Sequence, residues 1–133
     1  MTREVVTVYA NQQMSTAAQV LLDNRITGLP VVTFDGTCVG ILSAKDFLML
    51  DAETLEKHQV FQHMSSPVIS VEPNDSLLEV AATLRGNRIH RVPVIDDRGH
   101  VIGIVSTVDI VDEVFAIIDP DERPSDEVRL VAK

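Results

Sequence analysis

The chain contains an internal repeat, because shifting the sequence by 63 positions superposes it on itself without a gap. Residues 40–46 (GILSAKD) lie over residues 103–109 (GIVSTVD), and about a third of the positions from Met1 to Leu48 are identical to their partners. A unit of about 50 residues is too small to be stable alone. The repeat therefore predicts two similar halves that pack on each other about a pseudo-twofold axis.

The size and composition suit one compact domain or two closely packed halves, since 45% of the 133 residues are apolar. No apolar run approaches the roughly 18 residues that span a bilayer, and the N-terminus lacks the layout of a secretory signal. The single cysteine, Cys38, cannot form an internal disulfide. We therefore expect a cytoplasmic protein in which Cys38 is a small buried hydrophobic residue.

The net charge of −9 argues against partners that are themselves polyanions. Nonspecific nucleic-acid binding and anionic membranes call for a basic surface. The chain has no tryptophan and one tyrosine, so no stacking platform for single strands is visible. Acidic residues gather in residues 119–133, which we expect to form a solvated tail.

Each repeat reads as strand, helix, strand, strand, helix, which predicts a mixed α/β (α+β) fold. The expected first strands are 5–8 and 68–71, and the expected hairpin strands are 29–34 with 38–42 and 92–95 with 101–105. The first helices have apolar residues at i, i+3, i+4 and i+7 from Met14 and from Leu77, and are expected to stop at Asn24 and at Gly86-Asn87. A second helix opens at Ser43 or Ser106. Its expected apolar positions are Phe47, Leu48 and Leu50, or Ile110, Val111, Val114 and Phe115, and further helix is expected from Ala52.

The doubled Ser-x-x-Asp motif, Ser43 to Asp46 and Ser106 to Asp109, permits two interpretations. Serine at the N-cap with an acid three residues later is a helix-capping arrangement. The same geometry offers free N–H groups to an anion and two carboxylate oxygens to the hydroxyls of a ribose. Capping and nucleotide binding both remain open at this stage.

A basic pair, His90-Arg91, precedes the strand that begins at Val92. Arginine offers a fixed fork of donors to phosphate, and histidine can titrate near neutral pH. The alternative is a solvated pair that matches an acidic surface. The equivalent residues of the first repeat, Thr27 and Gly28, carry no charge, so two anion sites built on this motif would be unequal.

The sequence shows no identifiable catalytic or metal-binding motif. His58, His63 and His100 have no ligand spacing with one another, and there is no HExxH, CxxC, GxSxG or Walker A sequence. We therefore expect neither an enzyme nor a metal site.

The order and spacing of several short motifs resemble those of a tandem pair of cystathionine-β-synthase (CBS) domains, often called a Bateman module. The motifs that carry the resemblance are residues 64–71 (MSSPVISV), 89–96 (IHRVPVID) and 103–110 (GIVSTVDI), and in the first repeat Thr7, residues 29–32 (LPVV) and residues 40–46. The resemblance covers roughly residues 1–118. We divide the chain into CBS domain 1 (1–57), CBS domain 2 (58–118) and the acidic tail (119–133).

The resemblance implies two pseudo-symmetric β-α-β-β-α units packed through their sheets, with two ligand clefts between the halves. It also implies AMP, ADP, ATP or S-adenosylmethionine as a regulatory ligand, with or without Mg²⁺, and no required cofactor. By similarity Asp46 and Asp109 would hold the ribose, and Ser43, Ser106 and Thr107 would help with ribose or phosphate. The adenine would be edged by Val5, Thr7, Val68 and Ser70. His90 and Arg91 would meet phosphate, mainly at the Asp46 site, and Thr27 is their uncharged counterpart.

From these observations we expect a stand-alone module that senses energy state or a metabolite. A ligand-independent module for protein interaction or oligomerisation is the alternative. Tandem pairs of this family commonly associate again, so a homodimer is expected, and an effector protein is a possible further partner. Because Thr27-Gly28 lacks cations, we expect the Asp109 site to bind poorly or to prefer a less charged ligand.

Overall fold

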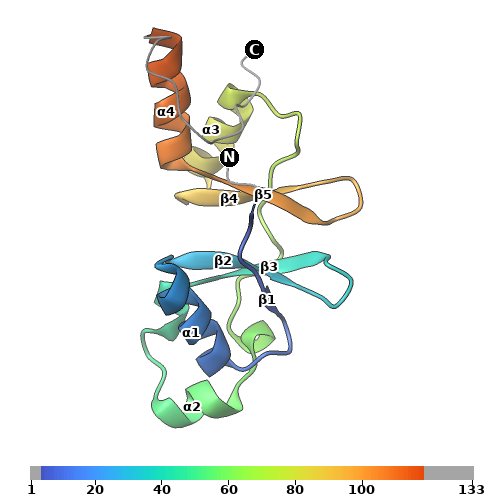
Figure 1. Ribbon diagram of the computed structural model, residues 1–133, viewed down its shortest axis with the longest axis vertical. Helices are drawn as coiled ribbons and strands as arrows, with labels where there is room; N and C mark the ends of the chain where they lie inside the picture. Colours follow the sequence, from blue (N-terminus) through green and yellow to red (C-terminus); the bar gives the residue numbers. More distant parts are fainter. Residues whose placement is uncertain (1–3, 119–133) are drawn as a thin grey trace. The chain divides into compact units, whose positions relative to one another are not determined.

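The computed structural model describes residues 4–118, which form two compact units (Figure 1). One unit comprises Val6–Val68. The other comprises the described residues from Ile69 onward together with Glu4 and Val5. The acidic segment 119–133 lies outside the described residues. Within each unit the helices lie on one face of the sheet (Figure 1).

The first unit is built on a three-stranded sheet of order β1-β2-β3. Its elements are β1 (Val8–Tyr9), α1 (Met14–Asn24), β2 (Gly28–Val32), β3 (Cys38–Ser43), the 3-10 helix η1 (Ala44–Phe47), α2 (Ala52–Lys57) and the 3-10 helix η2 (Val60–Gln62). Strand β1 pairs in parallel with β2, and β2 pairs antiparallel with β3. Its core consists of Val8, Met14, Ala17, Leu21, Leu29, Val31, Leu42 and Val60. Cys38 is buried as expected, and this burial raises the pKa of its thiol.

The second unit repeats this plan on a two-stranded sheet, β4-β5. Its elements are α3 (Leu77–Gly86), β4 (Arg91–Ile95), β5 (Val101–Ser106) and α4 (Thr107–Ile118). The hairpin registers are equivalent, since Leu29 pairs with Leu42 and Val92 pairs with Val105. Even the irregularity in the ladder recurs, after residue 31 in one unit and after residue 94 in the other. The expected β-α-β-β-α plan is confirmed.

The first strand of each repeat is shorter than the sequence suggests. The run 5–8 contributes a strand only from Val8, and the run 68–71 contributes a single bridge between Val71 and Val94. The N–H of Val71 donates to the carbonyl of Pro93 (3.0 Å), and the N–H of Ile95 donates to that of Val71 (2.9 Å). A β-branched run becomes a strand only where a partner strand lies beside it, and the pairing here covers only one or two residues.

The first helices end where expected, but a different residue makes the turn. Asn24 and Asn87 each donate from the side-chain amide to the carbonyl four residues earlier (2.8 Å in both cases). The residues that follow these asparagines, Arg25 (φ 53°) and Arg88 (φ 55°), adopt the left-handed conformation. Both arginines occupy the same position of the repeat, so this helix termination belongs to the repeated plan.

The closing helices differ from expectation in both repeats. In the first repeat the chain forms only the turn η1 at Ala44, and a new helix, α2, starts at Ala52 as predicted, with the Asp51 carboxylate accepting the N–H of Thr54 (2.8 Å). Phe47 and Leu50 pack on the core, whereas Leu48 is exposed.

In the second repeat α4 is continuous, and its buried side includes only one of the four apolar positions named from the sequence. Ile110 packs on the core and Glu113 and Ala116 are buried, at three-residue spacing, whereas the other apolar positions, Val111, Val114 and Phe115, are exposed. Hydrophobicity alone does not fix which side of an apolar helix meets its own sheet.

The close approach of strand β3 to residues 64–65 requires glycine at position 40. Ile41 and Ser65 exchange two backbone hydrogen bonds (3.1 and 2.9 Å). A Cβ atom on Gly40 would lie 2.6 Å from the sulfur of Met64 and 2.9 Å from the carbonyl oxygen of Ser65. The thioether can move, but the carbonyl belongs to the paired backbone.

We expect Gly40→Ala to lower the free energy of unfolding by about 1–3 kcal/mol through overpacking. The control is Gly86→Ala at the end of α3, where nothing lies within 4 Å of the added atom. That variant should be neutral or more stable by about 0.5–1 kcal/mol, since alanine favours the helix. Urea unfolding measures both, and wild-type stability of Gly40→Ala would contradict the packing argument.

Candidate ligand-binding site

The Ser-x-x-Asp motif forms the same hydrogen-bonded turn in both units. The backbone N–H of Ser43 donates to Oδ2 of Asp46 (2.8 Å), and that of Ser106 donates to Oδ2 of Asp109 (2.7 Å). In the second unit the N–H of Asp109 also donates to the hydroxyl of Ser106 (3.3 Å). The capping interpretation of the motif is therefore confirmed for both repeats.

Capping uses only half of each carboxylate. Among the hydrogen bonds of residues 4–118, Oδ2 is the oxygen that Asp46 and Asp109 engage, and Oδ1 of each accepts none. Both side chains are half-buried, so each carboxylate is held in place while one oxygen remains available. A fixed carboxylate oxygen can accept hydrogen bonds from a sugar diol, so capping and ligand binding are compatible.

A second repeated contact places this turn against the start of the hairpin. The N–H of Ala44 donates to the carbonyl of Thr27, and the N–H of Thr107 donates to the carbonyl of His90 (2.8 Å each). The hydroxyl of Thr107 reaches the His90 carbonyl as well (3.2 Å). We call each such junction a corner: residues 27–28 with 43–46 in the first unit, and residues 90–91 with 106–109 in the second.

The corners bring most of the predicted site residues together. Strand pairing sets Gly28 opposite Ser43 and Arg91 opposite Ser106. The second corner thus gathers His90, Arg91, Ser106, Thr107 and Asp109, and the first gathers Thr27, Ser43 and Asp46. His90 is exposed and Arg91 is half-buried. The basic pair therefore belongs to the Asp109 corner within its own unit. That it binds phosphate mainly at the Asp46 site stays a prediction.

The residues predicted to contact the adenine are not hydrogen-bonded to the corners. Among the described hydrogen bonds, none links Thr7 to the first corner or Ser70 to the second. Val5 and Val68 fall on the opposite side of the division between the units from their own repeats. Their role stays a prediction.

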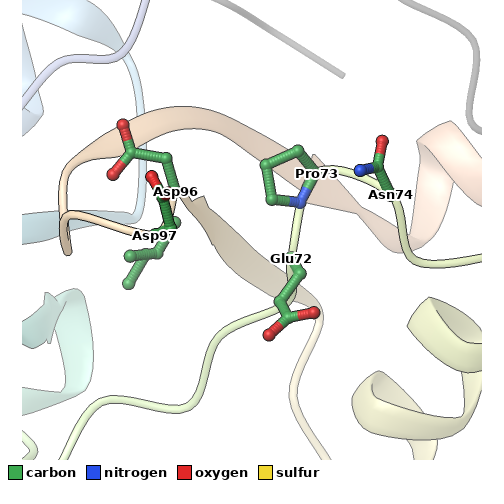
Figure 2. A pocket seen from close by; sticks show the side chains of 6 residues that line it. Glu72, Pro73, Asn74, Asp96 and Asp97 are labelled. Atoms are coloured by element: carbon green, nitrogen blue, oxygen red, sulfur yellow. The ribbon is translucent and has the colours of Figure 1, made fainter.

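The structure also contains two cavities at equivalent positions of the repeats, which no sequence motif predicts. One, of about 390 Å³, is lined by Tyr9, Ala10, Asn11, Val32, Thr33 and Phe34, and the other, of about 410 Å³, is lined by Glu72, Pro73, Asn74, Ile95, Asp96 and Asp97. Figure 2 shows the acidic cavity, with Asp96 and Asp97 on one side of it and Glu72, Pro73 and Asn74 on the other. None of the predicted ligand residues lines either cavity.

The acidic cavity does not amount to a metal centre. The backbone N–H groups of His100 and, to a lesser degree, Arg98 donate to the Asp96 carboxylate, which lowers its pKa and occupies one of its oxygens. Within residues 4–118, no group of three or more histidine, cysteine, aspartate or glutamate side chains is placed to hold a metal ion. Nor is any helix in that range long and apolar enough to cross a membrane.

Two β-α-β-β-α units built on one repeated sequence define a tandem-repeat protein of mixed α/β class. The sequence model of the CBS domain matches residues 1–53 and again residues 59–116. The chain therefore belongs to the CBS domain family and carries a tandem pair of these domains.

The chain is similar to segments of much longer relatives. It is 31% identical over 112 residues to homoserine O-acetyltransferase of Methanococcus vannielii, a match that covers 83% of this chain and 23% of the relative. It is 29% identical over 122 residues to the human 5'-AMP-activated protein kinase subunit gamma-3, covering 81% of this chain and 24% of that subunit. The chain thus spans about a quarter of these relatives.

Solved structures of similar size match nearly the whole chain. CBSX2, a CBS-pair protein of Arabidopsis thaliana solved in complex with AMP, superposes with a TM-score of 0.80 at 28% identity, covering 89% of this chain and 94% of that one. The CBS domain pair of protein MJ0100, in complex with 5'-methylthioadenosine and S-adenosyl-L-methionine, gives a TM-score of 0.75 at 26% identity, covering 90% of this chain and 94% of that one.

The capping role of the two aspartates can be tested apart from any ligand. Asp46→Ala and Asp109→Ala remove the acceptor of the serine N–H and should each cost about 0.5–2 kcal/mol. Asp46→Asn and Asp109→Asn keep an acceptor oxygen and should cost clearly less. Urea unfolding of the four variants makes the comparison, and equal losses for alanine and asparagine would contradict the role of Oδ2.

Proposed function

We propose that this chain is a regulatory module that binds an adenosyl ligand (AMP, ADP, ATP or S-adenosylmethionine) through its two corners. The observation that carries the proposal is the Oδ1 of Asp46 and Asp109, which accepts no hydrogen bond within residues 4–118 and is half-buried at the same position of both repeats. Support comes from two solved relatives of the same fold, one in complex with AMP and one with S-adenosyl-L-methionine.

In this proposal the two corners supply the polar groups that contact the ligand. Asp46 and Asp109 accept hydrogen bonds from the ribose hydroxyls, since a carboxylate is an acceptor with two oxygens. Ser43, Ser106 and Thr107 assist at ribose or phosphate. His90 and Arg91 attract phosphate, and Thr27 is their neutral equivalent. Val5, Thr7, Val68 and Ser70 border the adenine.

In this proposal the module consists of two CBS domains, with the boundary between residues 57 and 58. Its action is regulatory. A ligand changes a protein's conformational equilibrium only through different affinities for the two states. The uncharged Thr27-Gly28 loop and the basic His90-Arg91 loop give unequal attraction for phosphate. The output would therefore depend on how many phosphate groups the ligand carries, with Mg²⁺ offsetting charge where a triphosphate binds.

A ligand-independent interaction module is the second candidate, and one observation favours it. The outer side of α4 exposes Val108 (67%), Val111 (60%) and Ile118 (75%), beside the half-exposed Phe115. An apolar surface of this kind is typical of association with another protein. A homodimer formed through α4 fits both candidates.

Thermal melting of refolded, ligand-stripped protein separates the two candidates. The ligands are AMP, ADP, ATP with and without Mg²⁺, and S-adenosylmethionine. A ligand at 100 times its Kd adds about 2.7 kcal/mol of stability, which raises the Tm by several degrees. We expect at least one adenosyl ligand to do so. No shift with any of them would favour the interaction module.

Asparagine variants test the ribose contact itself. Asp46→Asn and Asp109→Asn keep the cap but place an N–H₂ donor or a neutral oxygen where the charged Oδ1 stands. Since a hydrogen bond to a charged group contributes about 1.5–3 kcal/mol, the affinity at each site should fall roughly tenfold to a hundredfold. Isothermal titration calorimetry with the ligand found by melting measures the change.

Each unit supplies a matched control for this experiment. Asp51 accepts the N–H of Thr54 (2.8 Å), and Asp75 accepts the N–H of Glu72 (2.9 Å), both through carboxylates that lie outside the corners. Asp51→Asn and Asp75→Asn should bind as wild type does. Unchanged affinity in the Asp46→Asn/Asp109→Asn double variant would exclude the ribose role.

A further inference from the structure

The side chains of His58 and His63, whose spacing in the sequence predicts no joint role, contact each other in the first unit. Nδ1 of His58 lies 2.8 Å from Nε2 of His63, and both side chains are half-buried. The ring centroids are 5.0 Å apart and the ring planes differ by 21°. Because the centroids are so much farther apart than the nitrogens, the rings meet edge to edge along the line of these two nitrogens.

This geometry fits one shared hydrogen. One ring nitrogen must donate and the other must accept, so the contact forms when one, and only one, of the two facing nitrogens carries a hydrogen. When both rings are protonated, two N–H groups and two positive charges face each other. A metal ion fits less well, since two zinc–nitrogen bonds of about 2.0–2.1 Å in tetrahedral geometry would place the nitrogens about 3.3 Å apart.

The pair lies within a segment, residues 58–65, that makes backbone hydrogen bonds to several other parts of the first unit. The carbonyl of His58 accepts the N–H of Met14 at the start of α1 (2.9 Å). The N–H of Val60 donates to Gln12 (2.8 Å), and the side chain of Val60 is fully buried in the core. Ser65 pairs with Ile41 on β3, two residues before the serine of the first corner.

Few charges stand near enough to offset a doubly protonated pair. On α2, Asp51 interacts with His58, although the main cause of the lowered pKa of Asp51 is its hydrogen bond from the Thr54 N–H. The three charged residues within that helix, Glu53, Glu56 and Lys57, are exposed. Glu53 and Lys57 form a salt bridge with each other (2.7 Å). The start of α1, η2 and strand β3 present neutral residues to the segment: Gln12, Gln13, Val60, Phe61, Gln62 and Ile41.

We propose that His58 and His63 form an acid-sensitive latch that holds residues 58–65 in the first unit. At neutral pH the rings share one hydrogen and the segment stays closed. Double protonation separates the rings and loosens the segment that contacts α1 and β3. The proposal does not rest on the proposed ligand site, because the latch can be measured in the ligand-free protein.

The pH dependence follows from counting protons. The unfolded chain binds a proton on each imidazole at mildly acid pH, whereas the folded pair resists the second proton. Stability therefore rises with pH, because the unfolded state binds more protons. The loss occurs as the pH falls through the range from about 7.5 to 5.5, in which ordinary imidazoles take up protons.

Urea unfolding of the ligand-free protein at pH 7.5 and at pH 5.5 tests the latch. Tyr9 is the chain's one tyrosine, there is no tryptophan, and Tyr9 belongs to β1, so tyrosine fluorescence reports on the first unit. Between the two pH values the unfolding constant of the wild type should rise on the order of tenfold more than that of His58→Gln or His63→Gln. The control, His100→Gln in the second unit, should keep the wild-type dependence.

Proton NMR of the imidazole rings in the wild type provides a test that needs no variant to fold. The resonances of His58 and His63 should respond to pH together, in two coupled steps. Independent titration of both rings, or the same pH dependence of stability in wild type and both glutamine variants, would overturn the proposal. Stabilisation by Zn²⁺ at pH 7.5 that both variants abolish would overturn it in favour of a metal site.

Discussion

The site depends on one repeated backbone hydrogen bond, from the residue that follows the second hairpin strand to the residue that precedes the first. Ala44 donates it to Thr27 in one unit, and Thr107 donates it to His90 in the other. This bond fixes where the closing turn or helix begins relative to the hairpin. The aspartate two residues later is thereby placed beside the loop in front of the first hairpin strand. Both components are backbone groups, so the placement survives changes of side chain.

The two repeats keep this frame while their side chains diverge. Equivalent corners carry a neutral Thr27-Gly28 loop and a cationic His90-Arg91 loop. At equivalent cavities, Tyr9 and Phe34 of one unit correspond to Glu72 and Asp97 of the other. The core and hairpin register, which stability requires, are shared, and the exposed positions are free to differ. A duplicated frame can in this way present two chemically different sites.

The first unit differs from the second in how it closes. A continuous α4 covers the second sheet, whereas the first repeat breaks its helix after η1 and adds α2 and the segment 58–65. The backbone pairing of Ile41 with Ser65 joins that segment to β3, and β3 ends at the first corner. The segment that contains the histidine pair is therefore joined to the strand that leads into the Asp46 corner, two residues before Ser43.

Much of the fold could be predicted from the sequence, because the decisive interactions are short-range. The serine–aspartate turns, the hairpin glycines Gly36 and Gly99 with positive φ, and the cap at Ser76 all lie within three or four residues of their partners. The repeat itself determined the β-α-β-β-α plan. Tertiary structure alone decided how long each first strand is, which side of α4 is buried, and that His58 meets His63. Each of these depends on what lies beside the segment in space, and neither propensity nor spacing along the chain records that neighbour.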